Sequence, residues 1–229
     1  MVANPMQQIF KVVKCQSYNI SNIHVICAVI FYLLVFFGLL ARAQPVQKFY
    51  PNDTLKATGA ISEQGPEGEW RYFYPDGTRN AVLHYQQGQL HGEATYYGFK
   101  GKLIAREQWH YGVQEDSSWY YFPDGQLEKH GVFRQGLYNG LWQFYYENGP
   151  LKRQGTYQQG LPHGAWTFYH ADGTLQQEGH YQQGQEDGEW KFYTEDGRLE
   201  YVGSYRQGKR VEPWYYVNKR GKRKKVELE

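Results

Sequence analysis

The chain has 229 residues, a formal net charge of +2, an aromatic content of 18% and a mean hydropathy of -0.77. Its two Cys residues exclude a disulfide-rich scaffold, and its polar average excludes a protein that crosses a membrane many times. The near-neutral charge gives no reason to expect a nucleic-acid partner.

Residues 1–43 have the parts of a secretory signal peptide. Residues 25–40 are apolar and uncharged, follow a segment with two lysines, and precede Ala41-Arg42-Ala43, which has the A-x-A pattern of a cleavage site. The apolar run is shorter than the about 20 residues that span a bilayer as a helix. We therefore expect an apolar helix that is removed after Ala43, and a chain exported to the periplasm, the cell envelope or the medium. The alternative is an uncleaved membrane anchor at residues 25–40.

Cleavage after Ala43 would leave residues 44–229 with no Cys and no Met. Such a chain forms no disulfide and offers no thiolate to a metal or a substrate. Few Ile, Leu and Val residues remain in it, while most of the aromatic residues do. An ordered core must then come mainly from Trp, Tyr and Phe.

An internal repeat of about 24 residues explains this composition. Its consensus is G-x-W-x-F-Y-x-x-D-G-x-L-x-x-x-G-x-Y-x-x-G. The copies begin at Trp70, Ala94, Trp119, Trp142, Trp166, Trp190 and Trp214. The copy that begins at Trp119 is one residue shorter before its Asp-Gly pair, and a damaged half-copy begins at Phe49.

The repeat predicts β-hairpins. Short runs of Trp, Phe and Tyr favour strands, and the W-x-F alternation places both rings on one face of a sheet. Asp-Gly pairs such as Asp76-Gly77, and a second Gly such as Gly88, supply the turns because Gly tolerates a positive φ. Residues 44–229 show no helical periodicity. We expect an all-β fold, an elongated single-layer antiparallel sheet of stacked β-hairpins preceded by the N-terminal apolar helix.

The repeat resembles the MORN repeat family in its variant form. The shared pattern is G-x-Y-x-x-G-x-x-x-G-x-W, as in Gly155, Tyr157, Gly160, Gly164 and Trp166. The inserted F-Y-x-x-D-G-x-L half is similar to that of bacterial proteins labelled YwqK-like antitoxins. The resemblance covers residues 49–221 and implies a scaffold, a membrane-surface attachment or a protein-binding role, in some members against a toxin. It implies no enzyme, and an exported chain departs from the intracellular antitoxin pattern.

The repeated Trp residues predict the core, because one residue type at one repeat position packs in the same way in every unit. These residues are Trp70, Trp119, Trp142, Trp166, Trp190 and Trp214. The second aromatic of each F-Y pair points away from that core, so a row of half-exposed tyrosines is a candidate binding surface. The row consists of Tyr145, Tyr169 and Tyr193, with Tyr74 in a shifted motif. The alternative is lateral packing between neighbouring hairpins.

No motif points to catalysis, a metal or a cofactor. The eight histidines lack the H-x-x-x-H and H-E-x-x-H spacings. The acidic pairs Glu115-Asp116, Glu186-Asp187 and Glu195-Asp196 lie at turns and lack the dense oxygens of a calcium loop. No Ser has the G-x-S-x-G setting of a nucleophile. We predict no catalytic residue, no metal ligand and no cofactor.

The chain divides into three parts, a signal peptide or anchor at residues 1–43, an array of about seven repeats at 44–221, and a basic end at 222–229. The basic end begins with Lys222, Arg223, Lys224 and Lys225. These side chains are candidates for contact with an anionic surface. The alternative is that they protect the last strand of an open sheet from edge-to-edge pairing.

The sequence therefore predicts a non-enzymatic, exported scaffold that binds a macromolecule along its sheet, with a protein as the first choice of partner. One alternative is an antitoxin or immunity protein that neutralises a cognate toxin. Another is a binder of cell-envelope glycan or lipid, with membrane contact through the N-terminal segment or the basic end. No nucleic-acid partner is expected.

Overall fold

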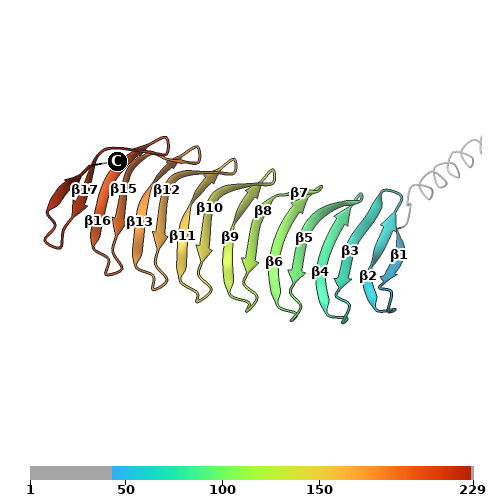
Figure 1. The fold of residues 1–229 in the computed structure, drawn as a ribbon. Coiled ribbons are helices and arrows are strands. Elements are labelled where there is room, and N and C mark those ends of the chain that lie inside the picture. Colours follow the sequence, from blue (N-terminus) through green and yellow to red (C-terminus); the bar gives the residue numbers. More distant parts are fainter. Residues whose placement is uncertain (1–42, 228–229) are drawn as a thin grey trace, which may run out of the picture. The chain divides into compact units, whose positions relative to one another are not determined.

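A computed structural model of the protein describes residues 43–227, which form one open antiparallel sheet of eighteen strands (Figure 1). The predicted all-β, antiparallel architecture is confirmed for this part of the chain. Within these residues no helix has the length and apolarity needed to cross a membrane. The expected helix at residues 25–40 and the cleavage-site residue Ala41 lie outside the described residues.

The first nine strands are β1 Gln44–Phe49, β2 Leu55–Ser62, β3 Gly65–Phe73, β4 Arg79–Gln86, β5 Gln89–Tyr97, β6 Leu103–His110, β7 Val113–Gln114, β8 Asp116–Tyr121 and β9 Leu127–Arg134. The last nine are β10 Leu137–Tyr145, β11 Leu151–Gln158, β12 Leu161–Tyr169, β13 Leu175–Gln182, β14 Gln185–Glu186, β15 Gly188–Tyr193, β16 Leu199–Arg206, β17 Lys209–Val217 and β18 Arg223–Val226.

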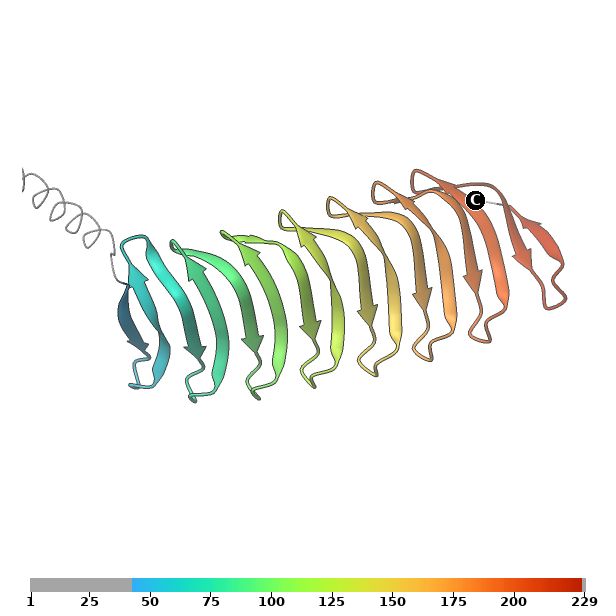
Figure 2. The same cartoon turned by 180° about the vertical axis from the view of Figure 1, so that it is seen from behind.

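Strands pair in chain order, so each hairpin contacts the one before it and the one after it. Two strands are interrupted by a single residue: β7 and β8 both pair with β6, and β14 and β15 both pair with β13. Strands β1 and β18 are the open edges, and no other layer of described residues covers either face (Figure 2).

The turns are linked from one unit to the next by hydrogen bonds. In the turn Gln87-Gly88 both residues have positive φ, 52° and 77°, which suits a tight two-residue hairpin. The N–H of Gly88 donates to the carbonyl of Pro66 in the preceding unit, over 3.1 Å. The same bond recurs in the next five units, at Gly112, Gly136, Gly160, Gly184 and Gly208. The turns thereby fix the spacing between hairpins.

Each buried indole lies over a glycine of the neighbouring strand. Trp166 faces Gly155, and a Cβ at Gly155 would lie 2.2 Å from the indole Cδ2. The indole Nε1–H donates to the carbonyl of Thr156 over 3.1 Å. The same arrangement joins Trp70 to Gly59, Trp142 to Gly131, Trp190 to Gly179 and Trp214 to Gly203. These five indoles are at most 3% exposed.

Trp119 does not belong to this row, and its prediction as a core residue is wrong. The residue that faces the glycine is Ser118, which pairs with Gly131 and is 0% exposed. Trp119 pairs with His130 instead and is only half-buried. The row therefore has a constant spacing of 24 residues and includes Ala94 and Ser118. The irregular spacing arises when Trp119, and not Ser118, is counted as the first residue of its copy.

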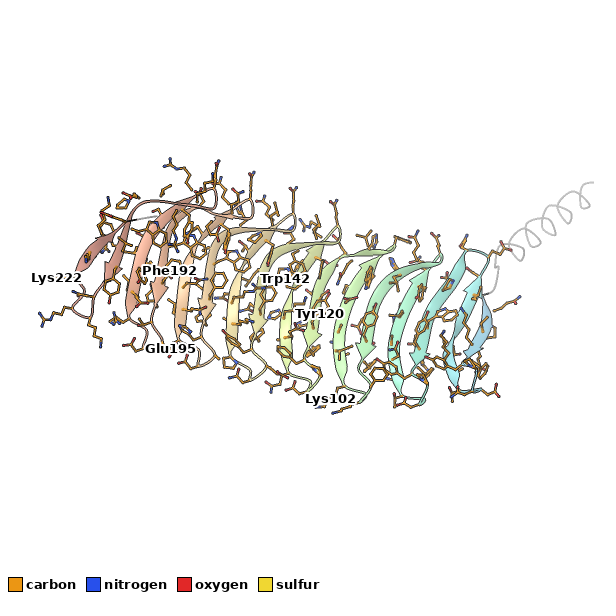
Figure 3. The ribbon with its side chains drawn as sticks, in the orientation of Figure 1. Lys102, Tyr120, Trp142, Phe192, Glu195 and Lys222 are labelled. Carbon is orange, nitrogen blue, oxygen red and sulfur yellow. The ribbon has the colours of Figure 1, made fainter. Side chains whose placement is uncertain are left out.

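Alternation along the strands gives the sheet two faces of different character. The tryptophan face carries the indoles and the Phe or Tyr two residues after each. From Tyr138 to Trp214 its rings contact one another in an unbroken series. For example, Tyr138 stacks on Trp142 with ring centroids 3.8 Å apart, and Tyr157 meets Trp166 edge-on with ring centroids 5.1 Å apart. The opposite face carries the residues in between. Figure 3 labels three residues of the tryptophan face, Tyr120 in β8, Trp142 in β10 and Phe192 in β15.

The substitution Gly155→Ala should destabilise the sheet by about 1–3 kcal/mol, because the new methyl group overlaps the indole of Trp166. The free energy of unfolding in urea measures the effect. In a Trp166→Ala background the same substitution should cost less than about 0.5 kcal/mol, since the indole is gone. Equal costs in the two backgrounds would show that the contact does not constrain the sheet.

Candidate functional site

The opposite face has one continuous central row of residues that pair strand by strand across the sheet. The row is mostly polar, with four apolar or aromatic members after β3. It runs through Thr58, Arg71, Val82, Thr95, Arg106, Trp119, His130, Gln143, Gln154, Thr167, Glu178, Lys191, Val202 and Tyr215. This row and its flanks change in charge along the sheet.

Near the N-terminal end the opposite face has a hollow of about 500 Å³ between β3 and β6. We call it the arginine hollow; its charged lining residues are Arg71, Arg79, Arg106, Glu69, Glu93 and, when protonated, His84. Arg71 Nε lies 2.7 Å from a Glu69 carboxylate oxygen, and Arg106 Nε lies 3.9 Å from one of Glu93. Both pairs are exposed, so each contributes little to stability and leaves the arginines accessible to other anions.

A second hollow, of about 230 Å³, lies four repeats further along between β12 and β15. We call it the glutamate hollow, because Glu178 and Glu189 line it with one cation, Lys191. The Lys191 ammonium lies 3.4 Å from an oxygen of each carboxylate. The two hollows use the same repeat positions but carry opposite excess charge.

Between the hollows the central row has no Asp, Glu, Lys or Arg, and this part of the opposite face is partly apolar. Val132 is 37% exposed and Leu141 is 53% exposed. Trp119 lies diagonal to Val132, because Ser117 pairs with Val132 and Trp119 pairs with His130, two residues away. We call Trp119, Val132 and Leu141 the apolar patch. Its flanks are the arginine hollow on one side and the glutamate hollow on the other.

The predicted tyrosine row is only partly assembled. Tyr145, Tyr169 and Tyr193 occupy one repeat position at the ends of β10, β12 and β15, and all three are half-buried. Burial raises the pKa of Tyr145. Burial and a 2.8 Å hydrogen bond to Glu178 raise the pKa of Tyr193 to about 12.

Tyr74 lies apart from that row, in the turn after β3. Its hydroxyl donates to the carbonyl of Tyr97 over 2.9 Å, and its ring stacks on that of Phe99 with ring centroids 4.1 Å apart. Tyr50 and Tyr146 make the same bond to the next unit. The contacts of Tyr74 are therefore those of a residue that links neighbouring turns.

The basic residues lie at the edge strand. Lys222 precedes β18, and Arg223, Lys224 and Lys225 lie within it, all exposed. Figure 3 shows Lys222 at the end of the sheet. Lys225 Nζ lies 2.7 Å from a Glu212 carboxylate oxygen, and the Arg223 guanidinium lies 6.0 Å from the Tyr215 ring. An exposed, cationic edge strand suits both of the predicted roles.

The acidic pairs at the turns have structural partners. Glu115 accepts a hydrogen bond from the N–H of Gln135 over 2.6 Å, and Asp187 accepts one from Gln207 over 3.2 Å, each in the next unit. The hydroxyl of Thr194 donates to Asp196, and this bond lowers the pKa of that carboxyl. Within the described part of the chain no three His, Cys, Asp or Glu residues gather as a metal site would require.

The tryptophan face contains a polar cluster where the indoles are missing. Ala94 and Ser118 stand in two consecutive Trp places. Glu107 stands in the glycine place before Ser118 and accepts hydrogen bonds from Tyr120 Oη (2.8 Å) and Trp109 Nε1 (3.0 Å). Gln114 Nε2 donates to Tyr120 Oη over 2.8 Å and to Ser118 Oγ over 3.2 Å.

Sequence reasoning missed both the apolar patch and this cluster. The signal for the patch was the missing residue between Trp119 and its Asp-Gly pair, which places Ser118 in the Trp register. The signal for the cluster was that two units lack the Trp of the consensus and also lack the glycine that would face it. Leu83 and Glu107 occupy those glycine places, next to Ala94 and Ser118.

Four segments of the chain match the family model described as MORN repeat variant, at residues 66–87, 138–159, 162–183 and 186–207. The polar cluster lies between the first match and the second. No curated protein matches the chain. Among solved structures the chain is similar to part of the crystal structure of TcdB2-TccC3, with 12% sequence identity over 75% of the chain and a TM-score of 0.18. The chain spans 13% of the length of that chain, and a similarity of this size does not bear on function.

The sheet should lose stability at alkaline pH. Burial is the largest cause that raises the pKa of Tyr96, Tyr181 and Tyr193 to about 12. A raised pKa in the folded state means that the folded chain holds these protons more tightly than the unfolded chain, whose tyrosines titrate near 10. The contribution of these tyrosines to the free energy of unfolding should be constant below about pH 9 and fall between about pH 10 and 12. Urea unfolding at each pH measures it, and a constant value up to about pH 12 would contradict the burial of these hydroxyls.

Proposed function

We propose that the chain is a non-enzymatic, exported repeat scaffold that binds a protein partner on the face opposite the tryptophans. The apolar patch carries this proposal. An exposed valine and an exposed leucine lie beside a half-buried tryptophan in the middle of a face that is mostly polar. Trp is enriched among the residues that contribute most to protein–protein binding, and these residues lie near the centre of an interface.

The surroundings of the patch also suit a protein partner. Interfaces combine an apolar centre with a polar, hydrated rim. Here the rim consists of the arginine hollow and the glutamate hollow, about four repeats apart. Strands spaced by about 4.8 Å, with two strands per unit, place the two hollows about 38 Å apart. A partner that covers the patch and reaches both hollows needs an acidic region at one end and a basic region at the other.

The repeat architecture supports binding as the general role. MORN repeats are binding units, and four of the repeats match the variant model. Stacked repeats offer an extended surface because each unit contributes the same positions to one face. Neutralisation of a cognate toxin is a narrower form of the same activity, and the identity of a captured partner would distinguish it from other forms of scaffolding.

Photo-cross-linking in the native host should capture the partner through the patch. A photo-reactive amino acid in place of Leu141 should give a cross-linked protein band that is identified by mass spectrometry. Trp119→Ala should reduce that band at least tenfold, because truncation of a central tryptophan costs about 2 kcal/mol or more of binding free energy.

Two controls separate binding from folding. Leu161 is 50% exposed at a turn, and a photo-reactive residue there should give no such band. Tyr215 occupies the repeat position of Trp119 at the far end of the row, and Tyr215→Ala should leave the cross-link unchanged. Absence of a band at Leu141, or a band that Trp119→Ala does not weaken, would refute the proposal.

Export rests on the N-terminal segment and has its own test. N-terminal sequencing of the protein isolated from its host should give a chain that begins at Gln44, because cleavage is expected after Ala43. A chain in the cytosolic fraction that still begins at Met1 would contradict export and favour an intracellular antitoxin.

A further inference from the structure

In the polar cluster on the tryptophan face, both residues of the indole–glycine contact are replaced in two consecutive units. Two Trp places hold Ala94 and Ser118, and two glycine places hold Leu83 and Glu107. The indole that would lie over the strand at Glu107 is absent, and the Glu107 side chain takes up that position on the face. Trp109, Gln114 and Tyr120 then bond to it or to one another.

Glu107 is a half-buried carboxylate with neutral partners. Its oxygens accept hydrogen bonds from Tyr120 and Trp109, and a side-chain hydrogen bond to Glu107 is also among the causes that raise the pKa of Tyr96. Among the ion pairs of residues 43–227 none includes Glu107. A carboxylate has about four lone-pair sites, so these three donors leave it some acceptor capacity. The ring of Tyr96 lies on the same face, beside Ala105, whose other strand neighbour is Tyr120.

Elsewhere on this face the chain places its own cations over its aromatic rings. Lys48 Nζ lies 5.4 Å from the Trp70 ring, Arg153 lies 4.4 Å from the Phe144 ring, and Arg210 lies 4.7 Å from the Trp214 ring. Lys129 Nζ lies 4.5 Å from the Tyr120 ring and donates to Tyr138 Oη over 3.0 Å. Within the described residues no Lys or Arg lies over Tyr96 or Trp109, and at this point the face carries the carboxylate of Glu107.

We propose that Glu107, with the rings of Tyr96 and Trp109, binds a primary ammonium group from another molecule. Aromatic rings attract a cation through their negative faces, and a carboxylate adds a direct charge interaction. The free lone pairs of Glu107 need N–H donors, which a primary ammonium has and a quaternary ammonium lacks. Lysine side chains and amino sugars both carry this group. The site lies on the other face from the apolar patch and is independent of the proposed protein interface.

Titration of the full chain with butylammonium tests the site. The readout is the NMR signal of the Trp109 indole N–H, which donates to Glu107 and is assigned by its loss in Trp109→Phe. We expect a saturable shift of this signal with a Kd of about 1 mM, as for one small group on a partly exposed site. Glu107→Gln should weaken binding at least tenfold. Tetramethylammonium should bind at least tenfold more weakly than butylammonium.

Two further variants keep the result interpretable. Glu178 also accepts a bond from a tyrosine hydroxyl but has its own cation, Lys191, so Glu178→Gln should leave the titration unchanged. The double variant Glu107→Gly with Ser118→Trp rebuilds the indole-on-glycine pair; it should fold, by circular dichroism, and lose the binding.

Titration with Nα-acetyl-lysine amide and with glucosamine then distinguishes the two sources of the ammonium. The ligand with the lower Kd indicates which source the site prefers. Absence of a saturable shift with butylammonium would overturn the proposal. An equal affinity for butylammonium in Glu107→Gln would also overturn it.

Discussion

The contact between each indole and the glycine beneath it is the constraint on which the sheet depends. A single-layer sheet has no second layer to bury its apolar side chains, so burial must come from within the layer. The absence of a Cβ at Gly155 lets Trp166 lie flat on the neighbouring strand, where its N–H finds the carbonyl of Thr156. Tyr rings from the two adjacent strands and a Phe ring from the same strand then surround the indole and leave it almost without exposure. The core is thus a line of local contacts, each made by one pair of neighbouring strands.

Because the contact is shared by two strands, its two residues change together. Where Trp is replaced by Ala94 the facing glycine place holds Leu83, and where it is replaced by Ser118 that place holds Glu107. The space above the strand is filled in every case, by an indole, by an aliphatic side chain or by a hydrogen-bonded carboxylate. The central units therefore keep the backbone of the repeat while offering different chemistry on the tryptophan face.

Much of the fold follows from the sequence, since the turns and the aromatic alternation are local signals. Asp-Gly and Gln-Gly pairs fix the hairpin ends, and the repeat fixes their order. The candidate site depends on the register of the strands, and a conspicuous residue such as Trp can lead to a wrong register assignment. Trp119 looks like the anchor of its unit, but the shortened distance to Asp124-Gly125 moves it by one place and so to the other face. Which side chains gather in the hollows depends on the register between consecutive strands, and no local motif marks them.

The missing indoles also bear on how the array holds together as a whole. In a stack of repeats each unit is stabilised by its own strands and by the interfaces with its two neighbours. The interfaces around Ala94 and Ser118 lack the contact that couples the others, although the turn at Gly112 still bonds to the unit before it. Strand pairing, turn bonds and the hydrogen bonds of the polar cluster therefore join the units at this place without an indole contact. Loss of structure in one half of the array is therefore not passed to the other half through an unbroken line of indole contacts.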